Sequence, residues 1–385
     1  MPLLNNSLYV ATVLLLLVLF ADWLGQRKYF HYLGASLVVI LAAAILANVG
    51  LLPSSQNPPS LYDGVFNYIA PLAIFYLLLD VRLKDLKVAG LPMILLFLAG
   101  AVATCIGAVT GYLLLAPQQH GIEKAFAVAG MYTGTYTGGS ANLNAVGLQY
   151  GVNKNGTLFA AINAADNILG TIWIMLTILL PSLLKRWLPR KNRKPEAAVQ
   201  KEGQPQSTDS IRETISVNDV SWLLVLGLAT ILVANSVSAW VPQIPSILTL
   251  TTIALLLAQT SFVNRLKGAK VFGYFLVLLF LAVIGAFCDL HALVQSGSLA
   301  LTLLAWIAII LLVHGLLLFT IGGLLKQDWD AISIASNANV GGTATAAVLA
   351  TALGRSDLRL PGLLVGSVGN AIGTYLGIMI AELLK

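Results

Sequence analysis

TGTYTGGSANLN, at residues 133–144, is the stretch that decides the fold of this chain. It has no Leu, Ile or Val before Leu143, although 58% of the 385 residues are hydrophobic and only 10% are charged. Polar backbone of this kind reaches membrane depth only where protein or a water-filled cavity surrounds it. A second such stretch, SNANVGGTATA, occupies residues 336–346. Both stretches therefore suit an internal site better than a lipid-facing surface.

The two stretches are copies of one pattern. A shift of 203 residues, without a gap, pairs the glycine doublet at 138–139 with that at 341–342, and Asn167 with Asn370. Membrane proteins that repeat a segment in this way often build one site from two halves. We therefore expect a single site to which both halves contribute.

Composition excludes a soluble globule, in which about 45–50% of residues are apolar. The net charge of +6 does not indicate a nucleic-acid partner, because the basic residues lie in short loops between apolar runs, where they set orientation. The chain is expected to be an all-α polytopic membrane protein.

Ten apolar runs are long enough to cross a hydrocarbon core of roughly 30 Å, taking about 17 residues as the short end. These runs are 8–24, 33–52, 65–80, 89–115, 156–184, 220–241, 245–261, 271–289, 297–325 and 359–383. The polar-glycine elements near 123–150 and 330–352 are additional, and either cross the membrane or re-enter it.

The distribution of Lys and Arg favours re-entry, since short cytoplasmic loops are rich in them. With both extra elements re-entrant and the N-terminus outside, 19 of the 22 basic residues lie inside, eight of them in the loop at 185–219. If the first element crossed instead, five of those residues would move outside. The residues at 189–219 then form a flexible cytoplasmic linker.

This topology predicts an inverted repeat. The first unit, 1–188, begins outside, and the second, 220–385, begins inside. Each unit has five transmembrane helices plus one broken or re-entrant polar-glycine element.

Asp166 is the only carboxylate well inside any of the ten runs, and Asn163 and Asn167 flank it. A charge near the bilayer centre costs at least about 2.5–3.5 kcal/mol, so an intramembrane acid is a functional candidate by default. The alternative is a structural carboxylate that is protonated or bonded to neighbouring helix ends. The matching position in the second half is Gly369, so the two half-sites differ in charge.

One acid among neutral oxygens suits one monovalent coupling ion, either Na⁺ or H⁺, because hard oxygen ligands favour an alkali cation over a transition metal. The expected ion-binding residues are Asp166, Asn167, Thr137, Ser140, Asn142 and Asn144. The expected substrate-binding residues are Gly138, Gly139, Asn337, Asn339, Gly341, Gly342, Thr343, Thr345 and Asn370. Beyond a Na⁺ ion at Asp166, no metal and no cofactor are expected.

The glycines predict two different roles. Adjacent glycines among polar residues break a helix, and a broken helix presents amide groups at one end and carbonyls at the other. Because the expected site has no Lys or Arg, half-helix N-termini would hold an anionic solute. Glycines four residues apart, at 130, 134 and 138 and at 369, 373 and 377, instead favour close packing of helices.

His314, in the run at 297–325, has two interpretations. It relays protons, or it is a packed, hydrogen-bonded residue, as a lone His on an apolar helix more often is.

TGGSANLNAV at 137–146, AADN at 164–167 and ANVGGTATAAVLA at 338–350 resemble a family of uncharacterised bacterial and plant membrane proteins typified by YjcL. The resemblance covers nearly the whole chain. That family is similar, more distantly, to cation-proton antiporters and sodium-coupled anion symporters. The resemblance implies secondary transport with a mobile core that slides against a scaffold. The Asp166 span lacks a tandem pair of acids, which weakens an electrogenic antiporter interpretation.

We therefore expect a cation-coupled secondary transporter of a small anionic organic solute in the bacterial cytoplasmic membrane. Residues 123–184 and 330–383 would form the core, and residues 8–52 and 220–261 the scaffold, which is also where a homodimer would form. A Na⁺/H⁺ antiporter is the nearest alternative, and a channel or receptor-like scaffold is a different class. An enzyme is not expected, because one Asp and His314 supply neither an acid pair nor a nucleophile with its base.

Overall fold

The computed structural model describes residues 4, 6–27, 34–54, 58–81, 86–187, 215–242, 244–288 and 297–385, and these residues form helices and no strand. The helices are α1 (Ser7–Gly25), α2 (Gly34–Asn48), α3 (Ser60–Gly64), α4 (Ala70–Leu78), α5 (Leu86–Ala89), α6 (Leu91–Leu115), α7 (Ala125–Gly138), α8 (Ser140–Gln149), α9 (Gly156–Trp187), α10 (Val217–Trp240), α11 (Ser246–Ala258), α12 (Ala269–Ala286), α14 (Gly297–Leu324), α15 (Trp329–Val340), α16 (Gly342–Ala352) and α17 (Ser356–Leu384). A π-helical turn, Val65–Ile69, joins α3 to α4. Most of the linker at 189–219 lies outside the described residues.

Eight helices in the described part of the chain are long and apolar enough to cross a membrane. The protein is therefore a multi-pass membrane protein. Two of the ten runs that were expected to span are shorter: 33–52 contains α2, of 15 residues, and 245–261 contains α11, of 13 residues. At 1.5 Å per residue they measure roughly 22 and 20 Å, below the roughly 30 Å of a hydrocarbon core. A turn at Gly50 with φ +76° follows α2, and Pro245 precedes α11.

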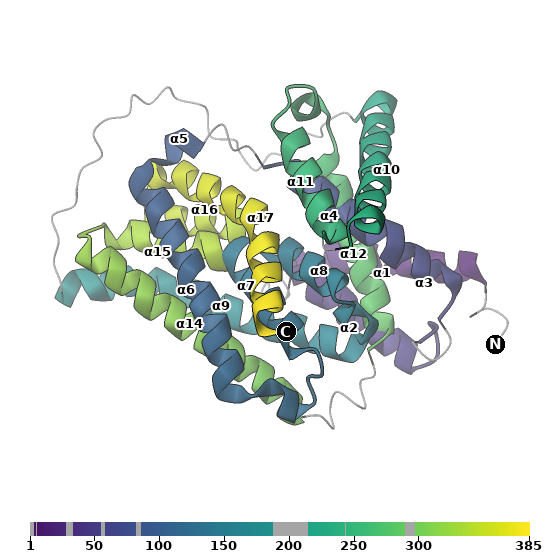
Figure 1. The fold of residues 1–385 in the computed structure, drawn as a ribbon, viewed down its shortest axis with the longest axis horizontal. Coiled ribbons are helices and arrows are strands. Elements are labelled where there is room, and N and C mark those ends of the chain that lie inside the picture. The colour runs from purple at the N-terminus through teal and green to yellow at the C-terminus, as the bar shows by residue number, and fades with distance from the viewer. Residues whose placement is uncertain are drawn as a thin grey trace.

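The helices form two groups (Figure 1). We call α1, α2, α3, α4, α10, α11 and α12 the panel group, in which α12 packs against α2 and α4, and α10 against α11. The other helices from α6 to α17 form the hairpin group, in which α6 packs against α14 and α7 against α17. The groups meet where α9 contacts α2 and α12, and where α8 contacts α4 and α11.

Helices α7 and α8 form a hairpin, which we call hairpin 1. At its open end, the Lys124 Nζ atom donates a hydrogen bond to the Tyr150 carbonyl at 2.7 Å. Midway, a Cβ atom on Gly134 would lie 3.1 Å from the Asn142 Cβ atom. The turn is at Gly139, whose φ of +90° and ψ of 173° are open to glycine and strained for other residues. The first polar-glycine element therefore folds back on itself.

Helices α15 and α16 form the corresponding hairpin 2. The Thr345 hydroxyl donates to the Asn337 carbonyl at 3.2 Å, although eight residues of a continuous helix would separate these groups by roughly 12 Å. Ion pairs close the open end of this hairpin, since Arg355, which follows α16, pairs with Asp328 and, at 3.1 Å, with Asp330 at the start of α15. The second polar-glycine element therefore also folds back on itself.

The open ends of the two hairpins lie at opposite ends of the hairpin group. Helix α9 begins beside the open end of hairpin 1, and its last turn contacts hairpin 2 through Lys185, whose Nζ atom lies 2.7 Å from the Asp330 carboxylate. Helix α17 runs the other way, from Arg355 to Glu382, which accepts a hydrogen bond of 2.8 Å from the Tyr150 hydroxyl. The tips of the hairpins therefore point toward one another.

Glycines bring α7 and α17 into backbone contact. A Cβ atom on Gly377 would lie 2.6 Å from the Gly130 carbonyl oxygen, and one on Gly373 would lie 2.9 Å from the Gly134 carbonyl oxygen. A Cβ atom on Gly138 would overlap the backbone of Gly369. The two sets of glycines spaced four apart thus face each other, which confirms the packing role predicted for them.

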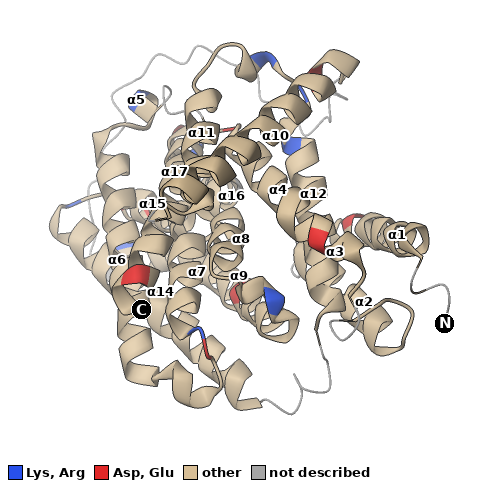
Figure 2. Cartoon of the chain, turned by 45° about the vertical axis from the view of Figure 1, so that its right-hand side comes forward, with Lys and Arg blue, Asp and Glu red and all other residues tan. Residues whose placement is uncertain are grey.

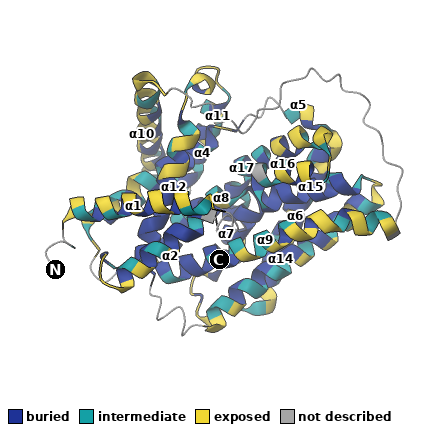
Figure 3. Cartoon of the chain, turned by 180° about the vertical axis from the view of Figure 1, so that it is seen from behind, coloured by how far each residue is buried: buried dark blue, intermediate teal, exposed yellow. Residues whose placement is uncertain are grey.

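The outer surface is apolar, as lipid contact requires. Exposed positions run along α1 and α10 (Figure 3), including Leu232 at 69% exposure. Figure 2 shows long stretches of helix without a charged residue. The polar interior of the hairpin group is consequently enclosed by apolar helices.

A candidate ion and solute pocket between two hairpin tips

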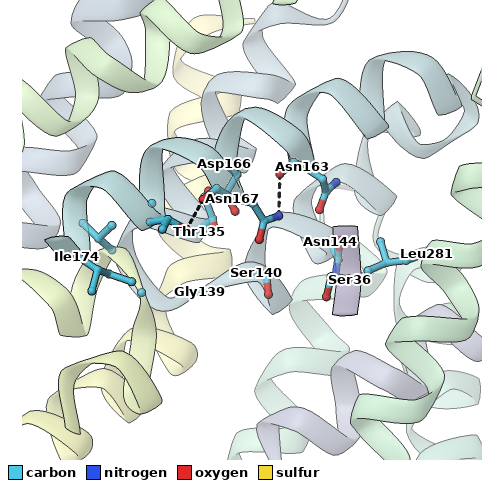
Figure 4. Close-up of a pocket in the computed structure, with 14 residues that line it drawn as sticks. Ser36, Thr135, Gly139, Ser140, Asn144, Asn163, Asp166, Asn167, Ile174 and Leu281 are labelled. Carbon is cyan, nitrogen blue, oxygen red and sulfur yellow. Dashed lines mark hydrogen bonds between the residues drawn. The ribbon is translucent and has the colours of Figure 1, made fainter. Parts of the chain in front are cut away.

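A cavity of about 180 Å³ lies where the hairpin tips meet (Figure 4). Its lining comprises Ser36, Thr135, Gly139, Ser140, Asn144, Asn163, Asp166, Asn167, Gly170, Thr171, Ile174, Leu281, Val340 and Gly341. Residues from both hairpins and from α9 therefore share one pocket. Its volume is close to the roughly 150 Å³ of a cavity that accommodates benzene.

Both helix breaks reach this pocket. Gly139 and Ser140 line it from hairpin 1, and Val340 and Gly341 from hairpin 2. Helix α8 starts at Ser140, and no side chain caps its N-terminus. The first amide groups of a helix and its dipole favour a negatively charged group. Hairpin 1 can thus present a helix N-terminus to an anion in the pocket.

Asp166 brings the only carboxylate among the lining residues. It lies on α9, and the hydroxyl groups of Thr135 and Tyr136 on α7 lie beside it. Asn163 lies one turn before both Asp166 and Asn167, so it shares a helix face with each, and both asparagines line the pocket too. The Asn167 amide donates to the Asn163 carbonyl at 2.8 Å, which orients its side-chain oxygen.

Asn144 brings a second side-chain oxygen to the pocket. Its side chain is 4% exposed, and its Oδ1 atom has no hydrogen-bond partner among the described residues. An unsatisfied buried oxygen costs about 1–3 kcal/mol, which a bound cation or donor removes. Carboxylate, amide and hydroxyl oxygens in one pocket are the ligands that a hard cation prefers.

The pocket also reaches the panel group. Ser36 on α2 and Leu281 on α12 line it opposite the α9 side chains. The pocket therefore lies at the boundary of the two helix groups, and relative movement of the groups would change its wall.

Of the predicted ion-binding residues, Asp166, Asn167, Ser140 and Asn144 line the pocket, whereas two lie in helix packing. Thr137 is fully buried in α7 and has no hydrogen-bond partner among the described residues. Asn142 accepts a hydrogen bond of 2.7 Å from the Thr374 hydroxyl and so joins α8 to α17.

Of the predicted substrate-binding residues, only Gly139 and Gly341 line the pocket. Asn337 donates to the Thr177 hydroxyl at 2.5 Å, and Asn339 donates to the Phe97 carbonyl at 3.1 Å. Thr345 donates to the Asn337 carbonyl within hairpin 2.

The remaining four predicted residues lie near the tips. Gly138 packs against Gly369, and Thr343 packs against Gly366 on α17. Gly342, with φ +78°, turns hairpin 2 next to Gly139. The Asn370 Oδ1 atom lies 3.8 Å from the position a Cβ atom would take on Gly139. These residues shape the tips and do not line the pocket.

Four polar lining residues, Asn163, Thr171, Thr135 and Ser36, were not among the predicted sites. Asn163 and Thr171 lie one turn before and one turn after Asn167 on α9, so helical spacing is the signal that identifies both. Thr135 lies one turn before Gly139 on α7, in a stretch rich in threonine. Ser36 comes from a distant panel helix, and no sequence signal marks it.

His314 lies outside the pocket and is fully buried. Its Nδ1 atom lies 3.0 Å from the Thr104 hydroxyl and 3.0 Å from the Gly100 carbonyl, and its Nε2 atom lies 3.0 Å from the Ser336 hydroxyl. The Ser336 hydroxyl also accepts from the Trp173 indole at 2.9 Å. This network joins four helices, which fits the packed, hydrogen-bonded interpretation of His314.

Comparison with known proteins agrees with this architecture. Residues 9–385 match the family described as "Protein of unknown function (DUF819)". The chain is also 31% identical over 372 residues to the "Uncharacterized membrane protein YjcL" of Bacillus subtilis (strain 168), and the match covers 92% of this chain and 91% of that protein. The chain therefore belongs to the DUF819 family of membrane proteins.

Proposed function

We propose that this protein is a Na⁺-coupled secondary active transporter of a small organic anion in the bacterial cytoplasmic membrane. One observation supports this most strongly: two hairpin tips and a single intramembrane carboxylate meet in one pocket, at the boundary of the two helix groups. Transporters built from repeats have their sites at such a junction of interrupted helices.

The opposed hairpins support an inverted repeat of 1–188 and 220–385. Hairpin 1 opens toward the start of α9 and hairpin 2 toward its end, as two copies in opposite orientation would. In this arrangement the N-terminus lies outside and the 189–219 linker in the cytoplasm, and both hairpins re-enter the membrane. The hairpin group is the mobile core and the panel group the scaffold.

The coupling ion binds to the Asp166 carboxylate, with Asn144, Thr135 and Asn163 supplying neutral oxygens. The anionic group of the solute binds at the N-terminus of α8, at Ser140, where the dipole attracts it. The cation offsets the charge of Asp166, which would otherwise repel the anionic solute. Movement of the core past Ser36 and Leu281 then exposes the pocket to the other side of the membrane.

Uptake by purified protein in proteoliposomes tests the function. A panel of radiolabelled mono- and dicarboxylates, presented with and without an inward Na⁺ gradient, should include a solute whose uptake the gradient raises at least tenfold. Asp166→Asn should abolish the gradient dependence. Asp22→Asn, which removes an acid from the panel helix α1, is the matched control and should leave uptake unchanged.

Other outcomes would replace the proposal. Na⁺-driven proton flux without any organic solute, lost in Asp166→Asn, would identify a Na⁺/H⁺ antiporter. Solute flux that is independent of Na⁺ and rises in proportion to the solute concentration, without saturation, would identify a channel.

A further inference from the structure

A second group of buried oxygens lies outside the pocket, between α9 and α15. Ser333 and Asn337 are one turn apart on α15 and therefore share a face. Thr177 on α9 contacts this face through its hydrogen bond with Asn337. All three side chains are completely buried.

The hydrogen bonds of this group leave two oxygens without a partner. The Asn337 amide nitrogen donates to the Thr177 hydroxyl and, at 3.3 Å, to the Ser333 carbonyl. The Thr177 hydroxyl donates its own proton to the α9 carbonyls of Trp173 and Ile174, each at 2.9 Å. The Asn337 Oδ1 atom and the Ser333 hydroxyl then have no partner among the described residues. An amide oxygen only accepts, so its missing partner is a donor or a cation.

The electrostatic surroundings favour a cation. Asn337 lies in the last turn of α15, where the carbonyl groups of the helix end carry partial negative charge. The basic residue that joins α9 to α15, Lys185, pairs with Asp330 at the opposite end of α15. Because the ligands are neutral, no negative charge would compensate the two charges of a buried divalent ion. Burial of the single charge of a monovalent ion costs less free energy.

We infer that Ser333, Asn337 and Thr177 form a second monovalent-cation site, separate from Asp166. This inference rests on the proposed function, since it gives the coupling ion a second place to bind. Ile174 and Val340, each three residues from a member of the group, line the pocket. The second site thus lies next to the pocket, on the side of the hairpin 2 open end, and two cations would accompany each anion.

Binding of ²²Na⁺ to the purified full-length protein in lipid nanodiscs tests the inference. The wild-type protein should bind two ions per chain, and Asp166→Asn should retain one. Ser333→Ala should also retain one, whereas Ser333→Thr, which keeps the hydroxyl, should bind two. Thr177→Val, which preserves side-chain volume, should weaken the second ion at least tenfold.

Ser336→Ala is the matched control, because it removes a hydroxyl from the same helix that already has partners in Trp173 and His314. It should still bind two ions. One ion in the wild type and none in Asp166→Asn would overturn the second site and leave the proposed function standing, with ordered water as the occupant. Two ions in both Ser333→Ala and Thr177→Val would overturn the assignment to these residues. No bound Na⁺ in the wild type would overturn both this inference and Na⁺ coupling.

Discussion

Substitution of one glycine between α7 and α17 tests the packing on which the pocket depends. In Gly377→Ala, the new Cβ atom would lie 2.6 Å from the Gly130 carbonyl oxygen and 2.8 Å from a Val146 methyl group. Carbon–oxygen contacts between helices are ordinarily about 3.3 Å or longer, so the helices must separate by roughly 0.7 Å. Overpacking of this kind costs about 1–3 kcal/mol.

Gly64→Ala provides the reference for this change. Gly64 is helical, with φ −61°, and a Cβ atom there meets nothing within 4 Å. Exchange of glycine for alanine inside a helix is by itself favourable by roughly 0.5–1 kcal/mol. The free energies of unfolding of the two variants should therefore differ by about 1–3 kcal/mol, with Gly377→Ala the less stable.

The measurement is equilibrium unfolding in mixed detergent micelles, followed by tryptophan fluorescence. The variants should also differ in function, because separation of α7 from α17 moves hairpin 1 relative to Asp166 and lowers Na⁺ affinity. Equal unfolding free energies for the two variants would refute the backbone contact between α7 and α17.

Three further predictions concern the hairpins and the pocket. Gly139→Ala should destabilise the protein by about 1–3 kcal/mol and abolish uptake, because φ +90° with ψ 173° is strained for alanine; unchanged thermal stability would contradict the turn. Ser36→Phe should fill the pocket from the panel side and lower solute uptake at least tenfold while ²²Na⁺ binding persists; loss of Na⁺ binding as well would show that Ser36 acts on the ion. Arg355→Ala should lower the free energy of unfolding by roughly 1–3 kcal/mol, since Asp328 loses its ion-pair partner and Asp330 keeps only Lys185; unchanged unfolding in detergent would mean that the ion pairs do not stabilise hairpin 2.

Features that depend on backbone chemistry were readable from the sequence. The doublets at 138–139 and 341–342 predicted helix breaks because glycine tolerates φ angles that other residues avoid, and a turn occurs at each. Asp166 was conspicuous because charge is rare at membrane depth. It lines the pocket together with Asn144, Asn167 and Ser140.

Features that depend on helix rotation were not readable. Four residues of the same polar stretches face neighbouring helices instead, because protein surrounds these parts of α7, α8 and α15: Thr137, Asn142, Asn337 and Asn339. In the sequence, polar side chains that face a neighbouring helix look the same as polar side chains that line the pocket. Ser36 could not be found for a related reason, since its place in the pocket depends on how two helix groups pack.

The packing of hairpin 1 against α17 also has a consequence for the synthesis of the chain. Helix α7, in the first half of the chain, packs against α17. Helix α17 is synthesised after all the other described helices. At 5–20 residues per second, this leaves roughly 10–45 s during which the glycine face of α7 has no partner. Hairpin 1 is therefore made well before the helix that covers its glycine face, and its final packing forms only when α17 joins it.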